Sequence, residues 1–133
     1  MGWIKKMLGL EEKRQVQPVS ITDDNFAAEV RKSELPVLLD IWSPGCAPCR
    51  QLEPVVMELA ARYEGRLKVC EMNAASAPRT AARLNVRGTP TVIYFNKANE
   101  VERVVGFRAG HYHQEIIETL VPPPQQVAQP QTA

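Results

Sequence analysis

The chain has 133 residues, enough for one domain with a hydrophobic core and loose ends. Its formal net charge of +1 gives no strong attraction to nucleic acid or to a membrane surface, and no apolar run approaches the length of a transmembrane helix. Three cysteines are too few and too unevenly spaced for the disulfide framework of a small secreted protein. These features favour a globular domain that binds no nucleic acid.

Residues 1–15 form a charged amphipathic segment. Its apolar side chains share one face of a predicted short helix: Trp3, Ile4, Met7 and Leu8. Lys5 and Lys6 interrupt the apolar run, so the segment does not resemble an export signal, and we expect the protein in the cytoplasm. Two interpretations stay open. The helix packs on the domain or a neighbour, or it docks reversibly on a partner or on a membrane surface, which would make the protein peripherally membrane-associated.

Residues 16–121 alternate between strand-like and helix-like patterns. A short strand around Val19 precedes a helix that Thr22 is expected to cap. The run VLLDIW over 37–42 is apolar except at Asp40, which is typical of a strand buried on both faces, as in a parallel sheet. After the first two cysteines, apolar residues recur at helical spacing as far as Tyr63, and Pro54 inside this stretch predicts a kink.

The second half of the domain continues the alternation. The elements expected there are a strand over 67–73, a helix over 79–86, two strands joined by a turn at 97–100, and a last helix over 113–120. This order predicts an α/β fold with a central mixed β-sheet flanked by helices. From Pro122 the sequence is rich in Pro and Gln, so residues 122–133 are expected to be a disordered tail.

The segment WSPGCAPCRQLEP places Cys46 and Cys49 two residues apart where a helix begins. The unpaired N–H groups and the dipole of a helix N-terminus stabilise a thiolate and can lower a cysteine pKa from ~8.5 to ~3.5–7.5. We therefore expect Cys46 to be the exposed attacking thiolate. Cys49, one turn further in, is expected to be the less exposed thiol that resolves a mixed disulfide.

Two other interpretations of the cysteine pair are weaker. A zinc site needs further ligands, and the remaining candidates, Cys70, His111 and His113, lie far along the chain. We expect both histidines to be surface residues at the start of the last helix, and we predict no metal site. A purely structural disulfide would close so short a loop that it would stabilise the fold little.

These residues resemble the thioredoxin family. The resemblance rests on Asp40, Trp42, Cys46, Pro48, Cys49 and Pro54 in the run 37–54, on Pro90 in NVRGTPTVIYF, and on Gly106 after the last strand. It covers residues 17–121 and implies the thioredoxin fold and thiol–disulfide exchange with protein substrates. It also implies that the protein binds no cofactor of its own, because its reducing equivalents come from NADPH through a flavin-dependent thioredoxin reductase.

The resemblance also implies roles for single residues. Cys46 resembles the family's nucleophile and Cys49 its resolving cysteine, while Asp40 resembles the buried acid that relays a proton to or from the resolving thiol. A carboxyl in a buried strand should have a raised pKa, which suits proton transfer near neutral pH. Pro90 resembles the cis-proline that faces the disulfide, next to the Thr89 backbone with which a substrate strand pairs. The substrate-binding surface is thus expected at Trp42, Gly45, Thr89, Pro90 and Gly106.

Two departures from the family pattern lie in the cysteine segment. Gly45 stands where the family usually has Trp, and Ala47 stands where it usually has Gly. The loss of an aromatic platform at Gly45 should leave a flatter surface and a different set of substrates, although neutral drift would also account for it. Residues between the cysteines tune the reduction potential, which spans roughly −270 to −120 mV in related folds.

A third departure is Glu71, which stands where the family commonly has Lys on the strand expected next to Asp40. Two carboxylates about 4 Å apart repel each other by ~4 kcal/mol at an intermediate dielectric. We expect Glu71 to modulate the pKa of Asp40, so that one of the pair titrates with a raised pKa, unless Glu71 turns to solvent. Cys70 should point to the other sheet face as a small buried hydrophobe.

The sequence thus supports two functions. The first is a protein disulfide reductase, a thiol–disulfide oxidoreductase that acts in electron transport and cell redox homeostasis with a thioredoxin reductase and disulfide-containing proteins as its partners. The second is a thioredoxin-like binding module that docks one dedicated partner. The presence of both cysteines and of Asp40 argues against the second.

Overall fold

The computed structural model describes residues 16–124. The predicted amphipathic helix of residues 1–15 lies outside the described residues, as does most of the predicted tail, and both stay predictions. Within the described part, no helix is both long enough and apolar enough to cross a membrane.

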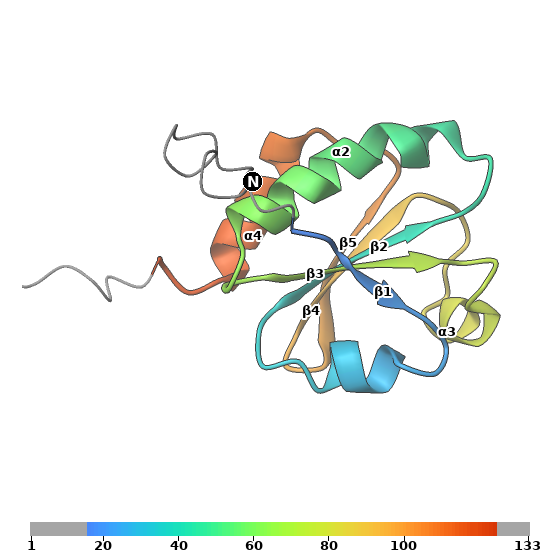
Figure 1. The fold of residues 1–133 in the computed structure, drawn as a ribbon, viewed down its shortest axis with the longest axis horizontal. Helices are drawn as coiled ribbons and strands as arrows, with labels where there is room; N and C mark the ends of the chain where they lie inside the picture. Colours follow the sequence, from blue (N-terminus) through green and yellow to red (C-terminus); the bar gives the residue numbers. More distant parts are fainter. Residues whose placement is uncertain (1–15, 125–133) are drawn as a thin grey trace, which may run out of the picture.

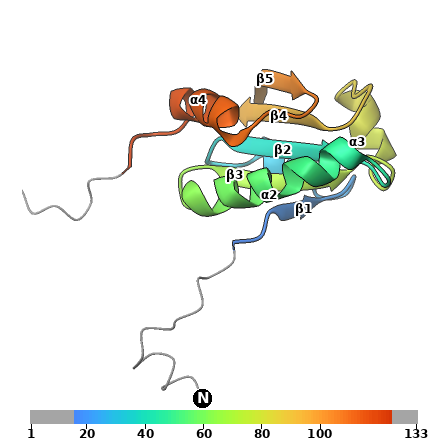
Figure 2. The same cartoon turned by 90° about the horizontal axis from the view of Figure 1, so that it is seen from above.

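A five-stranded mixed sheet forms the centre of residues 16–124. The elements along the chain are β1 (Val19–Ile21), η1 (Ala27–Arg31), β2 (Val37–Trp42), α2 (Ala47–Arg62), β3 (Lys68–Asn73), α3 (Pro78–Arg83), β4 (Thr91–Asn96), β5 (Asn99–Val105) and α4 (Gly110–Leu120). Across the sheet the strand order is β1-β3-β2-β4-β5, and Figure 2 shows it from one edge to the other. β3 pairs in parallel with β1 and β2, whereas β4 runs antiparallel to β2 and β5. The predicted mixed sheet flanked by helices is confirmed.

Helices cover both faces of this sheet. α2 and α4 lie on one face, and η1 and α3 lie on the other (Figure 1). The two-residue period of the strands sends alternate side chains to the two layers, so Leu38 packs under α2 and α4 while its neighbour Leu39 packs against the η1 and α3 side. Both residues are fully buried. Because both faces of β2 are covered, its sequence is an almost continuous apolar run.

The central strand β2 positions the cysteine pair. β2 leads through a short loop directly into α2, so the N-terminus of α2 stands at the carboxyl end of the strand. Asp40 shares the α2 face of β2 with Leu38, and it pairs in register with Glu71 of the neighbouring strand β3. α2 is a single helix that continues through Pro54.

The first helix differs from the prediction. η1 is a five-residue π-helix that begins after Phe26, and no side-chain hydrogen bond caps it. The Thr22 hydroxyl instead accepts hydrogen bonds from the backbone N–H groups of Asp24 and Asn25, at 3.2 and 3.3 Å. Thr22 thus stabilises the turn that precedes the helix rather than the helix terminus itself, a distinction that residue type alone does not make.

The prediction that His113 is a surface residue is wrong. α4 begins at Gly110, three residues earlier than expected, and His113 lies four residues before the buried Ile117, on the helical face that packs on the sheet. His113 is 1% exposed, and its Nδ1 lies 2.6 Å from the hydroxyl oxygen of Tyr94. Burial, and to a smaller extent the charge of Arg108, lowers the pKa of His113 to about 4. His111 is exposed, as expected.

Candidate active site

Cys46 and Cys49 form a disulfide at the N-terminus of α2. Cys46 is the N-cap residue, and its sulfur accepts a hydrogen bond of 3.2 Å from the backbone N–H of Cys49. This bond uses one of the N–H groups that a helix N-terminus leaves unpaired, and in the reduced protein it would stabilise a thiolate at Cys46. Cys46 is half-buried, whereas Cys49 is buried. The more accessible residue of the pair is therefore the first cysteine.

A second segment faces the disulfide from the start of β4. The Thr89–Pro90 peptide bond is cis, as expected. The carbonyl oxygen of Thr89 lies 3.6 Å from Sγ of Cys46, and the backbone N–H of Gly106 donates a hydrogen bond of 2.8 Å to the carbonyl oxygen of Pro90. The Thr89–Pro90 segment thus lies at the sulfur of Cys46, and Gly106 is bound to that segment through Pro90.

Ser43 ties two of these segments together, and sequence reasoning missed it. Its hydroxyl oxygen lies 2.6 Å from the hydroxyl oxygen of Thr89, 46 residues further along the chain. The contact holds the loop after β2 against the loop before β4. A serine beside Trp42 carries no signal of its own in the sequence, because its partner is known only once the two loops are brought together.

Gly45 has a backbone conformation that favours glycine. Its φ of +76° lies in the left-handed region, where a side chain would be strained even though a Cβ there would meet no atom within 4 Å. The residue is exposed and lines a cavity. Glycine is therefore also favoured here because the turn before Cys46 needs a left-handed backbone conformation at this position.

A cavity of about 430 Å³ lies beside the disulfide. Its walls come from the segment before β1, from β2 and the loop after it, from α2, and from β3. The lining residues are Gln17, Pro18, Asp40, Trp42, Ser43, Pro44, Gly45, Cys46, Cys49, Arg50, Glu53, Val56, Met57 and Glu71. The cavity brings both cysteines together with three acidic side chains from three different elements.

Asp40 is the most deeply buried of these acids. It is 6% exposed, and its Oδ1 atom has no hydrogen-bond partner among the residues that the structure describes. Burial raises the pKa of Asp40 to about 7, and the negative charges of Glu71 and Glu53 add to the effect. A carboxyl with this pKa exchanges protons near neutral pH, and it lines the same cavity as Cys49.

Glu71 faces the cavity from β3. Its Oε2 atom accepts a hydrogen bond of 2.7 Å from the indole Nε1–H of Trp42, and the side chain is half-buried. Trp42 and Asp40 are two residues apart on β2 and therefore point to the same face of the sheet. The indole thus holds Glu71 on the face that carries Asp40, and Glu71 does not simply turn to solvent.

Glu53 was not singled out from the sequence, although a signal for it existed. It lies four residues after Cys49 in the predicted helix, and residues with this spacing share one helical face. Its charge acts on Asp40 from α2, and the residue itself is exposed. This spacing alone did not identify Glu53, because many helical residues have a charged residue four positions away. Only the cavity shows that Glu53 lies near Asp40.

The remaining ionisable candidates lie away from this cavity. Cys70 is fully buried in the layer under η1 and α3, and burial raises its pKa to about 12, so its thiol stays protonated at neutral pH. This agrees with the expectation of a small buried hydrophobe. Between residues 16 and 124, no group of three or more His, Cys, Asp or Glu side chains is arranged to hold a metal ion.

Comparison with known proteins indicates the same protein family as the fold and the disulfide do. The thioredoxin family model matches residues 17–119. Thioredoxin 1 of Nostoc sp. is 43% identical over 86 residues, which are 65% of this chain and 80% of that protein. The thioredoxin of Synechocystis sp. matches equally well, at 43% over 86 residues with the same shares. The chloroplastic M-type thioredoxin of Spinacia oleracea is 38% identical over 96 residues, 72% of this chain and 52% of that protein. The chain therefore belongs to the thioredoxin family and is a thiol–disulfide oxidoreductase.

Proposed function

We propose that this protein reduces disulfide bonds of other proteins in the cytoplasm, with electrons that reach it from NADPH through a flavin-dependent thioredoxin reductase. One observation carries the proposal: the disulfide lies at the N-terminus of α2, where Cys46 is half-buried and its sulfur lies beside the Thr89 backbone. The buried free thiol of Cys70 suits a reducing compartment. A non-catalytic binding module is not favoured, because it would need no such redox pair.

The first step uses the reduced protein. The thiolate of Cys46, stabilised by the N–H of Cys49, attacks one sulfur of a substrate disulfide. The substrate S–S bond breaks as a new S–S bond forms between Cys46 and the substrate. The second substrate sulfur leaves as a thiolate and takes a proton from solvent. A mixed disulfide results.

The second step releases the substrate. The Asp40 carboxylate accepts the proton of the Cys49 thiol, either directly or through water in the cavity that both line. The Cys49 thiolate then attacks the sulfur of Cys46, and the other substrate sulfur leaves as a thiolate. Two electrons have passed to the substrate, and the disulfide between Cys46 and Cys49 is restored for the reductase.

Substrate recognition is proposed to use the surface around Cys46. A substrate strand that lies along the Thr89 backbone would bring its cystine next to the attacking sulfur, because the Thr89 carbonyl oxygen is 3.6 Å from it. Pro90 and Gly106 hold this segment through their backbone hydrogen bond. Gly45 and Trp42 would border the bound substrate on the side of the cavity.

A coupled reduction assay tests this function. The full-length protein, NADPH, a generic thioredoxin reductase and a disulfide-containing protein are expected to give continuous NADPH oxidation. Cys46→Ser should abolish turnover, and Cys49→Ser should stop at the mixed disulfide, which mass spectrometry detects. Asp40→Asn should form the mixed disulfide normally but release it more slowly. Turnover that survives Cys46→Ser would refute the mechanism, and an inactive wild type would refute the reductase assignment.

A further inference from the structure

The cavity beside the disulfide is acidic. Asp40 from β2, Glu53 from α2 and Glu71 from β3 line it, and Arg50 is the one basic side chain among its lining residues. Arg50 and Glu53 are both exposed, so the charges near the opening roughly balance, whereas the inner wall formed by Asp40 and Glu71 carries only acids.

A second, independent feature points to a missing partner. Asp40 lines this cavity and is 6% exposed, and its buried Oδ1 has no hydrogen-bond donor among residues 16–124. A buried acceptor without a donor destabilises the folded protein, and more so when the group is charged. A group with several N–H donors and a positive charge would satisfy the lone pairs of Asp40 and compensate its charge together.

Glu71 is arranged to contribute to the same contact. One of its carboxylate oxygens is held by the indole of Trp42, at 2.7 Å, which fixes the side chain on the face of Asp40. Among residues 16–124, no hydrogen bond uses the second oxygen of Glu71, so this oxygen can accept from a further donor. A cation between Asp40 and Glu71 would also favour the ionised form of Asp40, which is the form that accepts the proton of Cys49 in the proposed mechanism.

The position of the cavity indicates where such a cation would come from. Cys46 and Cys49 line it, so a substrate whose cystine has reached Cys46 has neighbouring residues within a few positions of the opening. An extended chain covers at most ~3.3–3.6 Å per residue, so one to three residues suffice to reach it. The volume of about 430 Å³ lies within the range of small-molecule sites, roughly 300–1,000 Å³, and admits one long side chain.

We propose that this cavity receives a lysine or arginine side chain of the substrate, held between Asp40 and Glu71, so that the protein prefers disulfides with a basic residue close to the attacked cysteine. This inference rests on the proposed function and adds a substrate class to it. It also gives the cavity side of the redox centre a binding role next to the surface formed by Thr89, Pro90 and Gly106.

A peptide series tests the preference. Each peptide is closed by one disulfide and carries a single lysine at one of the three positions before or after the attacked cysteine, and a matched peptide has glutamine at that position. The prereduced full-length protein is mixed with each peptide, and kcat/KM is measured at about 0.1 and 0.5 M salt, since high salt screens long-range steering. At one position or more, lysine should be preferred about fivefold, as for a partly buried charged hydrogen bond, and the preference should persist at high salt.

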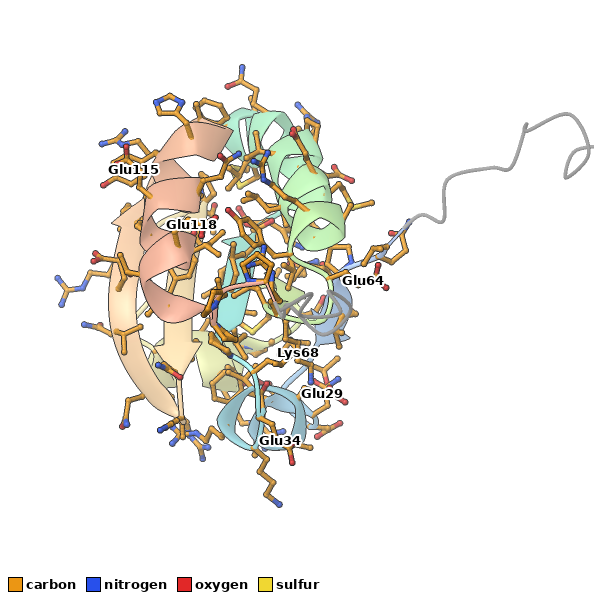
Figure 3. All side chains as sticks on the ribbon, turned by 90° about the vertical axis from the view of Figure 1, so that its left-hand side faces the viewer. Glu29, Glu34, Glu64, Lys68, Glu115 and Glu118 are labelled. Atoms are coloured by element: carbon orange, nitrogen blue, oxygen red, sulfur yellow. A yellow bond between two sulfur atoms is a disulfide. The ribbon has the colours of Figure 1, made fainter. Side chains whose placement is uncertain are left out.

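Three variants locate the effect. Glu71→Gln and Glu53→Gln should each reduce the ratio of lysine to glutamine rates, with the larger loss for Glu71→Gln. Glu34→Gln removes the same charge in the turn between η1 and β2, at the bottom of Figure 3, and the whole of β2 separates this turn from the cysteine pair along the chain. This control should leave the ratio unchanged. Ratios, rather than basal rates, are compared because Glu71 also acts on Asp40.

The outcomes separate the two proposals. Equal rates for lysine and glutamine peptides at every position would overturn the cavity proposal while the reductase function stands. A preference that disappears at high salt, or that Glu34→Gln weakens as much as Glu71→Gln does, would overturn it as well, because it would then reflect the overall field. If no peptide is reduced at all, the proposed function fails and the cavity proposal fails with it.

Discussion

The electrostatics of the redox centre depend on three side chains of two neighbouring strands. Asp40 and Glu71 are paired in register on β2 and β3, and Trp42 binds Glu71 through its indole N–H. Burial raises the pKa of Asp40 more than either neighbouring carboxylate does. The repulsion expected from the sequence is therefore present, but burial is the largest single cause of the raised pKa.

Glu71→Gln, in the oxidised protein, tests how much of the raised pKa of Asp40 comes from burial and how much from Glu71. The variant should lower the pKa of Asp40 from about 7, because one negative neighbour is lost, but it should leave the pKa above the ordinary value of 3.8, because the carboxyl stays buried. A carboxyl titration by NMR measures both, and Asp40→Asn identifies the signal by removing it. Glu58→Gln, an exposed substitution on α2, is the matched control. An ordinary pKa for Asp40 in the wild type would contradict the prediction.

At the scale of single elements, the β4–β5 hairpin has a turn whose backbone conformation favours glycine or asparagine, although its residues are of neither type. Lys97 and Ala98 connect the strands with φ values of +51° and +72°, although neither is a glycine or an asparagine. The hairpin was expected from the two flanking strand patterns, without the glycine that usually marks such a turn. The strands impose the turn because they bury apolar residues on β4, including Tyr94.

Ala98→Gly should therefore stabilise the protein. Left-handed backbone costs a non-glycine residue roughly 1–2 kcal/mol, and part of that gain is offset by the greater freedom of glycine in the unfolded chain, so we expect about 0.5–1 kcal/mol. Ala61→Gly, at an exposed position inside α2, is the matched control and should destabilise by about 1 kcal/mol. Urea denaturation of both variants measures the two changes. A loss of stability in Ala98→Gly would contradict this interpretation of the turn.

At the scale of the whole molecule, the two buried titratable groups Asp40 and His113 have opposite effects on how stability depends on pH. The pKa of Asp40 is raised in the folded state, so the folded protein binds more protons than the unfolded chain between about pH 4 and 7, and stability falls as pH rises through this range. The pKa of His113 is lowered to about 4, so the unfolded chain binds more protons between about pH 4 and 6.5, and stability falls as pH decreases. The two effects partly cancel in the wild type.

Single substitutions should separate the contributions of Asp40 and His113 to the pH dependence of the free energy of unfolding. Asp40→Asn leaves His113, so its free energy of unfolding should rise with pH between 4.5 and 6.5, and His113→Gln leaves Asp40, so its free energy of unfolding should fall. Each slope should differ from that of the wild type by about 1 kcal/mol per pH unit, in opposite directions. Urea denaturation of the oxidised proteins at several pH values measures this. Parallel curves for the wild type and both variants would show that neither group is buried in the form described here.

The amino-acid sequence by itself determined the features that depend on local pattern and on residues with a special chemistry. The apolar run around Asp40 predicted a buried strand, and the alternation of strands and helices predicted the mixed sheet. The spacing of Cys46 and Cys49 predicted a redox pair at a helix start. These predictions succeed because strand burial, helix termini and cysteine reactivity are decided within a few residues of the position concerned.

Only the tertiary structure decided which distant side chains meet. It brought Ser43 to Thr89 and Trp42 to Glu71, placed Glu53 at the cavity of Asp40, and buried His113 under Tyr94. Each of these depends on the register of two strands, on the closing of two loops or on how a helix packs against the sheet. A shift of one residue in the register of a strand moves each of its side chains to the other face of the sheet, and the sequence pattern specifies neither register nor helix ends that finely.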